Sequence, residues 1–225
     1  MKTRLCLLLA VLASLGCARI YRPVALAQPR AVLQGGTGDG DLAGQAVLQP
    51  WGDNSRYERK ALRANLRVVA LALENRSGAD LELLRVELPE GATAPSPGAA
   101  AALVKQQSLA YLLYPLLPAL VSLGSADRGS GYGPSDRMVF QGLSILGLGI
   151  ALPNAIIAAR SNHRLEAFFR GEAWTPGPLG AGQGRRGLIF VRAPAPHHPL
   201  PVRVVYRTPG GDRSLELIVP GVQPP

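Results

Sequence analysis

Two apolar segments near the middle of the chain constrain its fold more than any other feature. "SLAYLLYPLLPALVSLG" covers residues 108–124, and "MVFQGLSILGLGIALPNAIIAA" covers residues 138–159. The sequence between them is polar and rich in glycine, which is typical of a turn, so the pair predicts a helical hairpin. A membrane-spanning helix needs about 20 apolar residues, a length that the second segment reaches and the first only approaches. Prolines inside both segments, such as Pro153, predict kinks or breaks.

Either a membrane or the face of a sheet can cover such a hairpin. Its hydropathy favours membrane contact, whereas polar residues inside it, such as Gln141 and Asn154, leave open that it packs on a folded domain. The residues expected to contact a membrane are Leu112, Leu113, Leu116, Leu117, Leu146, Leu148, Ile150 and Ile156. The small residues expected to allow close helix packing are Gly142, Gly147 and Gly149. Residues 163–174 then predict a short, separate amphipathic helix.

Strand patterns lie on both sides of this middle segment. Val68 and Val69 favour a strand from Leu66 to Glu74, although a helix competes over residues 58–74. The turn residues 75–78 come next, followed by alternating apolar and charged residues typical of a half-buried strand. The other predicted strands are Leu81–Leu88, Gly187–Val191, Val202–Tyr206 and a last strand through Leu215, Leu217 and Val219.

These patterns predict a mainly β protein, an Ig-like β-sandwich interrupted by two apolar helices. The sandwich would take residues 56–98 and 171–225, with the hairpin and the short helix inserted over residues 99–170. Five strands are too few for a full sandwich. We therefore expect more strands before residue 60, over Val24–Leu33 or Leu42–Gln49.

The N-terminus has the three parts of an export signal. Lys2 and Arg4 are basic, residues 5–12 are apolar, and small residues follow. The apolar run is too short to span a membrane as a stable helix. We therefore expect the first residues to be removed on export.

Leu15-Gly16-Cys17 resembles the lipobox of bacterial lipoproteins, although Ser14 and Leu15 exchange the places usual in that family. In that family a signal peptidase cuts before the cysteine, whose thiol carries a diacylglycerol. The resemblance implies a signal peptide over residues 1–16, cleavage between Gly16 and Cys17, and acylation of Cys17 with fatty acids such as palmitate. The alternative is an ordinary secretory signal that is cut after Ala18. By the same resemblance, Ala18 in place of aspartate implies anchoring in the outer membrane, at its periplasmic face.

The cysteine count agrees with this interpretation. The chain has two cysteines, and Cys17 would be the one left after cleavage, so it could form no internal disulfide. A disulfide with Cys6 would require the signal to be retained. The glycine-rich stretch Gln34–Gln45, within the region 17–55, is typical of a flexible tether.

The net charge of +9 comes mostly from scattered arginines, which a genome rich in G and C explains as well as function does. Basic surfaces bind nucleic acid or anionic lipid. Export argues against nucleic acid, and so does the lack of interleaved aromatic residues. The expected partners are membrane lipid, a second copy through the hairpin, and a protein of unknown identity.

No pattern in the sequence indicates catalysis, a metal or a cofactor. Gly182–Gly187 matches G-x-G-x-x-G but precedes a strand, whereas the dinucleotide motif opens a helix. His197 and His198 are adjacent in an extended connector, and Asp39 and Asp41 lack the rest of an EF-hand. We expect an envelope lipoprotein of structural or interaction type and not an enzyme. The alternatives are a lipid-binding module with the hairpin as its lid, and a periplasmic enzyme whose site is built from distant residues.

Overall fold

The computed structural model describes residues 18–27, 37–38, 40–113, 134–194 and 198–221. The chain divides into two compact units. The first unit contains Met1–Tyr21 and Gln106–Arg164, and the second contains Arg22–Lys105 and Leu165–Pro225. The second unit carries all the strands of what is a mixed α/β protein rich in β structure.

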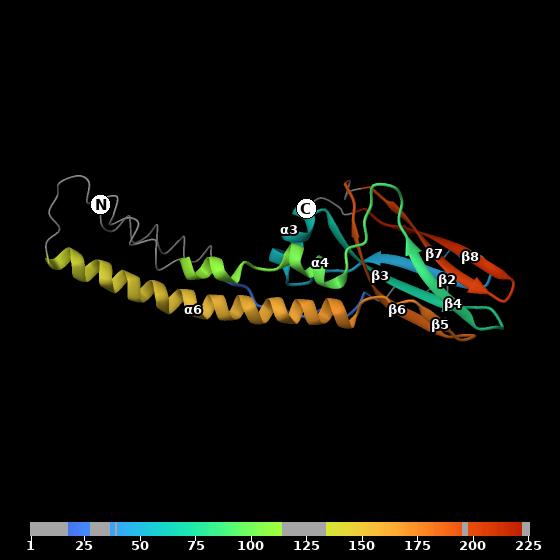
Figure 1. Ribbon diagram of the computed structural model, residues 1–225, viewed down its shortest axis with the longest axis horizontal. Coiled ribbons are helices and arrows are strands. Elements are labelled where there is room, and N and C mark those ends of the chain that lie inside the picture. Colours follow the sequence, from blue (N-terminus) through green and yellow to red (C-terminus); the bar gives the residue numbers. More distant parts are fainter. Residues whose placement is uncertain (1–17, 28–36, 39, 114–133, 195–197, 222–225) are drawn as a thin grey trace. The chain divides into compact units, whose positions relative to one another are not determined.

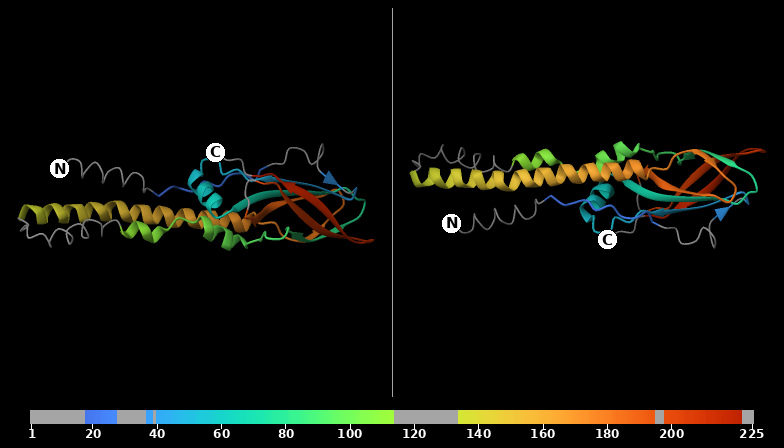
Figure 2. Two further views of the ribbon diagram at one scale, coloured as in Figure 1. Left: turned by 90° about the horizontal axis from the view of Figure 1, so that it is seen from above. Right: turned by 90° about the horizontal axis from the view of Figure 1, so that it is seen from below.

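The second unit contains two four-stranded antiparallel sheets (Figure 1). One sheet has the order β1-β2-β3-β6, and the other has the order β5-β4-β7-β8. The first sheet consists of β1 (Thr37–Gly38), β2 (Leu42–Leu48), β3 (Leu66–Asn75) and β6 (Gly184–Arg192). The second consists of β5 (Gly177–Leu179), β4 (Leu81–Glu87), β7 (Leu200–Thr208) and β8 (Gly211–Val219). Figure 2 shows the same strands from two further sides.

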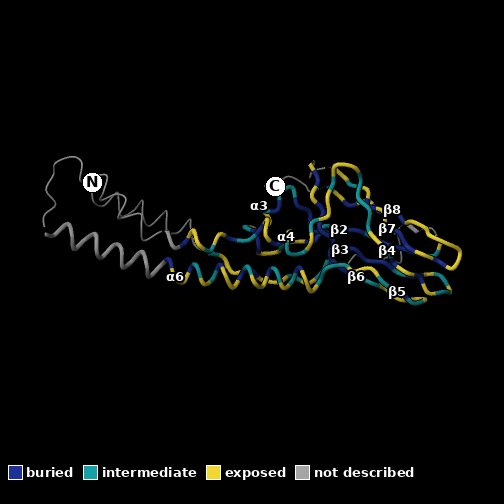
Figure 3. The backbone as a smooth tube through the Cα atoms, viewed as in Figure 1, coloured by how far each residue is buried: buried dark blue, intermediate teal, exposed yellow. Residues whose placement is uncertain are grey.

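A single apolar cluster lies between the two sheets and joins them. It draws on alternate residues of facing strands, such as Leu71 of β3 with Tyr206 of β7 and Leu217 of β8. Strand β3 is buried over nearly its whole length, with only Glu74 partly exposed. Its burial on both faces is visible as dark blue in Figure 3 and explains why its sequence is almost continuously apolar.

Most of the predicted strands are confirmed, with small changes of boundary. β3, β4, β7 and β8 match the predicted segments, and β6 begins earlier than expected, at Gly184. The expectation of a strand over Leu42–Gln49 is met by β2. Residues 37–38, in β1, and residues 42–45, in β2, therefore make part of the predicted tether a sheet. The other candidate, Val24–Leu33, has no regular structure through residue 27, and the rest of it lies outside the described residues.

The described residues form four helical segments: α3 (Ser55–Arg63), α4 (Pro97–Val104), the 3₁₀ segment η1 (Ser108–Leu113) and α6 (Pro134–Gly171). Of these, α6 is one continuous helix that includes Pro153. The predicted break at this proline is therefore wrong. Proline removes a single intrahelical hydrogen bond, and here its ring is exposed, so the helix continues past it. The predicted separate helix over residues 163–174 is also wrong, because α6 runs on to Gly171.

The first predicted apolar helix lies only partly in the described residues. Ser108–Leu113 forms η1, and residues 114–124 lie outside the described part of the chain. Within the described residues, no helix combines the length and apolarity required to cross a membrane.

Candidate functional site

The ten residues that follow Cys17 form neither helix nor strand, yet side chains from distant parts of the sequence hold their backbone. We call residues 18–27 the N-terminal arm. Four residues, which we call the clamp amides, hydrogen-bond to it, and each is at most 9% exposed. The clamp amides are Gln49, Asn54, Gln106 and Asn154.

In the first unit, Gln106 and Asn154 hold the start of the arm. The amide nitrogen of Ala18 donates to Oδ1 of Asn154 over 2.9 Å. Arg19 and Gln106 bind reciprocally: the backbone nitrogen of Arg19 donates to Oε1 over 3.2 Å, and Nε2 donates to the Arg19 carbonyl over 2.6 Å. The hydroxyl of Tyr111 also donates to Oε1 of Gln106. These contacts use both ends of the Gln106 amide and fix its orientation.

The backbone of Gln106 is itself held by α6. Its nitrogen donates to Oδ1 of Asn162 over 2.8 Å, and Nδ2 of Asn162 donates to its carbonyl over 2.7 Å. Asn162 therefore supports Gln106, which in turn holds Arg19. Reciprocal pairs of this kind repeat the two-bond contact between antiparallel strands, with a side-chain amide in place of one backbone.

In the second unit, Asn54 and Gln49 hold the rest of the arm. Asn54 binds Arg22 reciprocally, accepting from its nitrogen over 3.0 Å and donating to its carbonyl over 2.7 Å. Gln49 accepts from the nitrogen of Ala27 over 2.8 Å and donates to the carbonyl of Ala25 over 3.0 Å. Each unit thus holds its own part of the arm through buried amides.

Asn54 occupies the N-cap position of α3 but makes no side-chain capping bond. An asparagine there usually accepts a hydrogen bond from the first turn of its helix, which stabilises the helix by about 1 kcal/mol. Its Oδ1 accepts from Arg22 instead. Helix α3 therefore lacks a side-chain cap at Asn54, and the Asn54 amide binds the arm instead.

These hydrogen bonds between the clamp amides and the arm all use backbone atoms of the arm. Buried side-chain amides need hydrogen-bond partners, and the arm supplies them. Sequence reasoning missed this site. The available signal was that Gln106 and Asn154 are polar residues within or beside apolar segments, which indicates a buried polar contact but not its partner.

Several large apolar side chains of the first unit are exposed. Leu109 is 76% exposed, Leu152 57%, Ile20 55% and Ile156 43%. Ile156 is the one predicted membrane-contact residue whose side chain the structure describes. Leu112 and Leu113 end η1, and Leu146, Leu148 and Ile150 lie in α6 with the predicted packing residues Gly142, Gly147 and Gly149. Leu116, Leu117, Gly16 and the predicted lipid site Cys17 lie outside the described residues.

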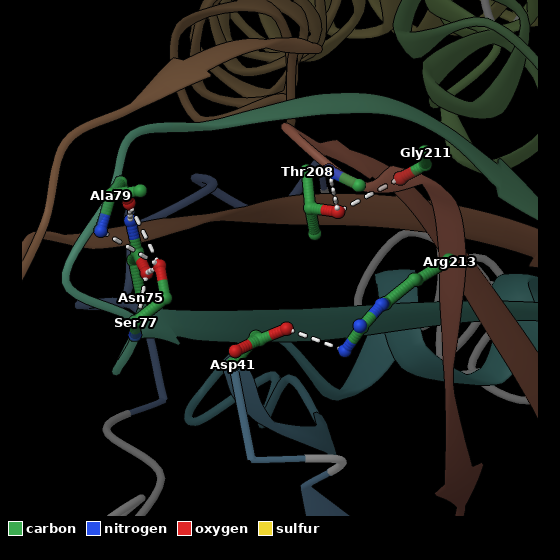
Figure 4. Close-up of polar contacts among 8 residues, drawn as sticks. Asp41, Asn75, Ser77, Ala79, Thr208, Gly211 and Arg213 are labelled. Atoms are coloured by element: carbon green, nitrogen blue, oxygen red, sulfur yellow. Dashed lines mark hydrogen bonds and ion pairs between the residues drawn. The ribbon is translucent and has the colours of Figure 1, made fainter.

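The turns of the second unit hold a further group of polar contacts, which Figure 4 shows. The side chain of Asn75 binds Ser77 and the carbonyl of Ala79, and Asp41 pairs with Arg213 over 2.6 Å. Asp41, which directly precedes β2, thus forms an ion pair with a residue of β8. Among the described residues, no three His, Cys, Asp or Glu side chains are grouped to hold a metal.

The other predicted motifs do not converge on a site. Gly184–Gly187 lies inside β6, so the G-x-G-x-x-G sequence opens a strand and not a helix. His163 and His198 are both exposed, and His197 lies outside the described residues.

Comparison with known proteins gives no further lead. No family model, no curated protein and no solved structure matches the chain.

Proposed function

We propose that this protein is an envelope lipoprotein of structural or interaction type, anchored by acylated Cys17 and by contact of the first unit with the membrane. The observation that carries the proposal is the fixed position of the residues directly after Cys17. Ala18 is hydrogen-bonded to Asn154, which lies within the second apolar segment. Arg19 is hydrogen-bonded to Gln106, which lies just before the first. An acyl group on Cys17 would therefore emerge next to the apolar part of the first unit.

The exposed apolar side chains supply the second attachment. One acyl chain gives only marginal membrane binding, and a second signal makes it stable. Ile20, Leu109, Leu152 and Ile156 belong to the same unit as the start of the arm and would enter the interface beside the lipid. The exposed cationic residues Arg160 and Arg164 follow on α6 and suit anionic headgroups. Surface contact is enough for this role, and no helix needs to cross the bilayer.

The strand order supports an Ig-like arrangement for the second unit. In that fold, strands A, B and E pair in one sheet, and C, F and G pair in the other. The orders β2-β3-β6 and β4-β7-β8 fit these two sets, with β5 beside β4 in the place of strand C′. The insertion then lies between strands C and C′, and we propose that residues 108–124 and α6 form its hairpin.

The decisive experiment is fractionation of cells together with mass analysis of the mature N-terminus. The proposal requires a chain that begins at acylated Cys17 and sediments with outer membranes. Cys17→Ser should move a large part of the protein to the soluble periplasmic fraction, and adding Leu109→Gln, Leu152→Gln and Ile156→Gln should release the rest.

Ile218→Gln is the matched control, because Ile218 is 57% exposed like Leu152 but lies in β8 of the second unit. It should leave the distribution between fractions unchanged. An unmodified mature chain that begins at Arg19 would exclude the lipid anchor. A triple variant that sediments as firmly as its Cys17→Ser parent would exclude membrane contact through these side chains.

A further inference from the structure

Helix α3 of the second unit carries its basic residues on one side. Its buried residues are Tyr57 and Ala61, and its single acid is Glu58. Its basic residues, which we call the basic stripe, are Arg56, Arg59, Lys60 and Arg63. With about 3.6 residues per turn, these four positions fall within about 100° of the helix circumference, and Glu58 lies outside this arc. The helix therefore separates a buried face from a cationic one.

The stability of the helix does not explain this arrangement. Cations stabilise a helix near its C-terminus, which suits Lys60 and Arg63 in the last turn, but Arg56 lies in the first turn. Like charges four positions apart repel and destabilise a helix. The stripe contains two such pairs, Arg56 with Lys60 and Arg59 with Arg63. An anionic partner outside the helix would relieve this repulsion.

Lys60 joins the stripe to the neighbouring elements of the same unit. Its ammonium donates to the backbone carbonyl of Lys105, directly after α4, and Lys105 in turn pairs with Glu166 of α6. Burial lowers the pKa of Lys60, and the adjacent Arg56 lowers it further. The ammonium thus lies in partly desolvated, positively charged surroundings and pairs with no carboxylate of the described residues.

Carboxylates are scarce around the stripe. Glu166 is shared between Lys105 and Arg170. Arg59 and Arg63 are exposed, and neither forms an ion pair within the described part of the chain. On the sheets of the same unit, by contrast, a carboxylate pairs with each of three exposed arginines, Arg85, Arg207 and Arg213. The surface around α3 therefore has an excess of positive charge that its own residues do not balance.

We propose that the basic stripe of α3 binds the phosphate groups of anionic phospholipid headgroups. Anionic membrane surfaces attract clusters of basic residues. Arginine suits this contact because its guanidinium forms two parallel hydrogen bonds to a phosphate. A row of cations along an exposed helix face also suits a planar array of phosphates. The inference rests on the proposed function, since it requires the protein to lie at a membrane, but it adds a contact that needs neither the lipid on Cys17 nor the apolar side chains of the first unit.

The test uses the full mature chain with Cys17→Ser, so that no covalent lipid contributes to binding. Sedimentation measures its partition into vesicles of phosphatidylcholine alone and of phosphatidylcholine mixed with phosphatidylglycerol. The protein should bind the anionic vesicles more tightly, and this gain should fall as the salt concentration rises. Binding to the neutral vesicles reports on the apolar contact of the first unit and is scored separately.

Two double variants remove the same charge from different places in the second unit. Arg59→Gln with Arg63→Gln removes half of the stripe and should weaken binding to anionic vesicles about tenfold. Arg186→Gln with Arg203→Gln removes two exposed arginines of the sheets, in β6 and β7, and should leave it nearly unchanged. Both variants should bind neutral vesicles as the parent does. Circular dichroism confirms that each is folded before binding is measured.

Three results would overturn the proposal. The parent binds neutral and anionic vesicles equally; the two double variants weaken binding equally, which would assign the effect to net charge alone; or the stripe variant loses binding to polyglutamate but not to anionic vesicles, which would make an acidic polymer the partner. None of these results bears on whether Cys17 is acylated or whether the first unit contacts the membrane, which the fractionation experiment tests.

Discussion

The turn after β3 and the N-terminal arm depend on the same chemistry, buried side-chain amides that hydrogen-bond to backbone, but the turn uses mostly local contacts and the arm uses distant ones. Asn75 binds Ser77 and Ala79, two and four residues away, and makes one long-range hydrogen bond over 2.9 Å to the carbonyl of Leu179, 104 residues away. The arm residues that the clamp amides hold lie between 22 and 136 positions away from them. An amide within a turn shapes a segment that is already in place, whereas a clamp amide must bring a segment to it.

This difference has an energetic side. If a clamp amide is removed, the arm can leave for solvent, where its backbone groups bind water, so the loss is about 0.5–1.5 kcal/mol per net hydrogen bond. The groups around Asn75 cannot leave, because the turn is tied to β3 and β4. Removing Asn75 leaves its partners in the turn unsatisfied, among them the buried carbonyl of Leu179, and an unsatisfied buried group costs about 1–3 kcal/mol.

The largest effect is therefore expected for Asn75→Ala. The side chain is fully buried and makes hydrogen bonds to Ser77, Ala79 and Leu179. Its loss should lower the free energy of unfolding by about 3 kcal/mol in urea titrations. Arg76→Ala, the exposed neighbour, should change it by less than about 0.5 kcal/mol. A similar cost for both variants would mean that the turn is not held by the buried amide.

The next largest effect is expected at a close backbone contact in the second unit that involves no side-chain amide. Gly187→Ala would push a Cβ against the backbone of Trp174 and should cost about 2 kcal/mol, as overpacking usually does. The fluorescence of Trp174 should change with it. Gly184→Ala in the same strand meets only an ordinary contact, 3.5 Å from the carbonyl oxygen of Leu73, and should be tolerated in both assays. Equal effects of the two would remove the special role of Gly187.

Variants that release the N-terminal arm should lower the free energy of unfolding less than Asn75→Ala or Gly187→Ala. They should strongly increase the local opening of the arm itself. Gln106→Leu removes both bonds to Arg19, and cleavage of the Arg19–Ile20 bond by trypsin should accelerate about tenfold, for about 1.4 kcal/mol of lost protection. Gln107→Leu, at the exposed neighbouring position, should leave the rate unchanged. Mass spectrometry of the shortened chain provides the readout. Under conditions where both variants stay folded, Asn75→Ala should leave this cleavage rate unchanged. If it accelerates cleavage as much as Gln106→Leu does, the arm and the turn open together and are not held independently.

The smallest effect is expected for a local but exposed pair. Arg207 donates to Asp212 over 2.7 Å across the β7–β8 turn, and this hydrogen bond holds the pKa of Asp212 below its usual range. A carboxyl group whose pKa is lowered in the folded state stabilises the fold at pH values above its ordinary pKa. This stabilisation is lost as the pH falls through the lowered pKa. Because both groups are exposed, Asp212→Asn should barely change the free energy of unfolding at neutral pH. In urea titrations at several pH values, the free energy of unfolding of this variant should fall slightly less steeply with acidification than that of the parent protein. A large loss of stability at neutral pH would show that a local contact stabilises the fold strongly even when it is exposed.

The sequence predicts well what depends on neighbouring residues. The alternation in β4, β7 and β8 and the turn at Asn75 follow from residues within a few positions of one another. The clamp amides carry no such local signal, since a polar residue such as Gln49 or Asn54 looks the same whether it faces solvent or an arm. The close approach at Gly187 is equally hidden, because a strand glycine has many uses. The continuity of α6 through Pro153 was missed since one lost hydrogen bond is small in a helix of 38 residues.

The backbone-only contacts of the clamp have a consequence for evolution. The hydrogen bonds between the arm and the clamp amides use backbone atoms of the arm, so they leave its exposed side chains, such as Ile20, free to vary, whereas Tyr21 is buried and constrained. Proline is disfavoured where a nitrogen donates, at Ala18, Arg19, Arg22 and Ala27. The constraint falls instead on four amides scattered through the rest of the gene. Orthologues of this protein should therefore keep an asparagine or glutamine at each clamp position while the sequence just after Cys17 drifts.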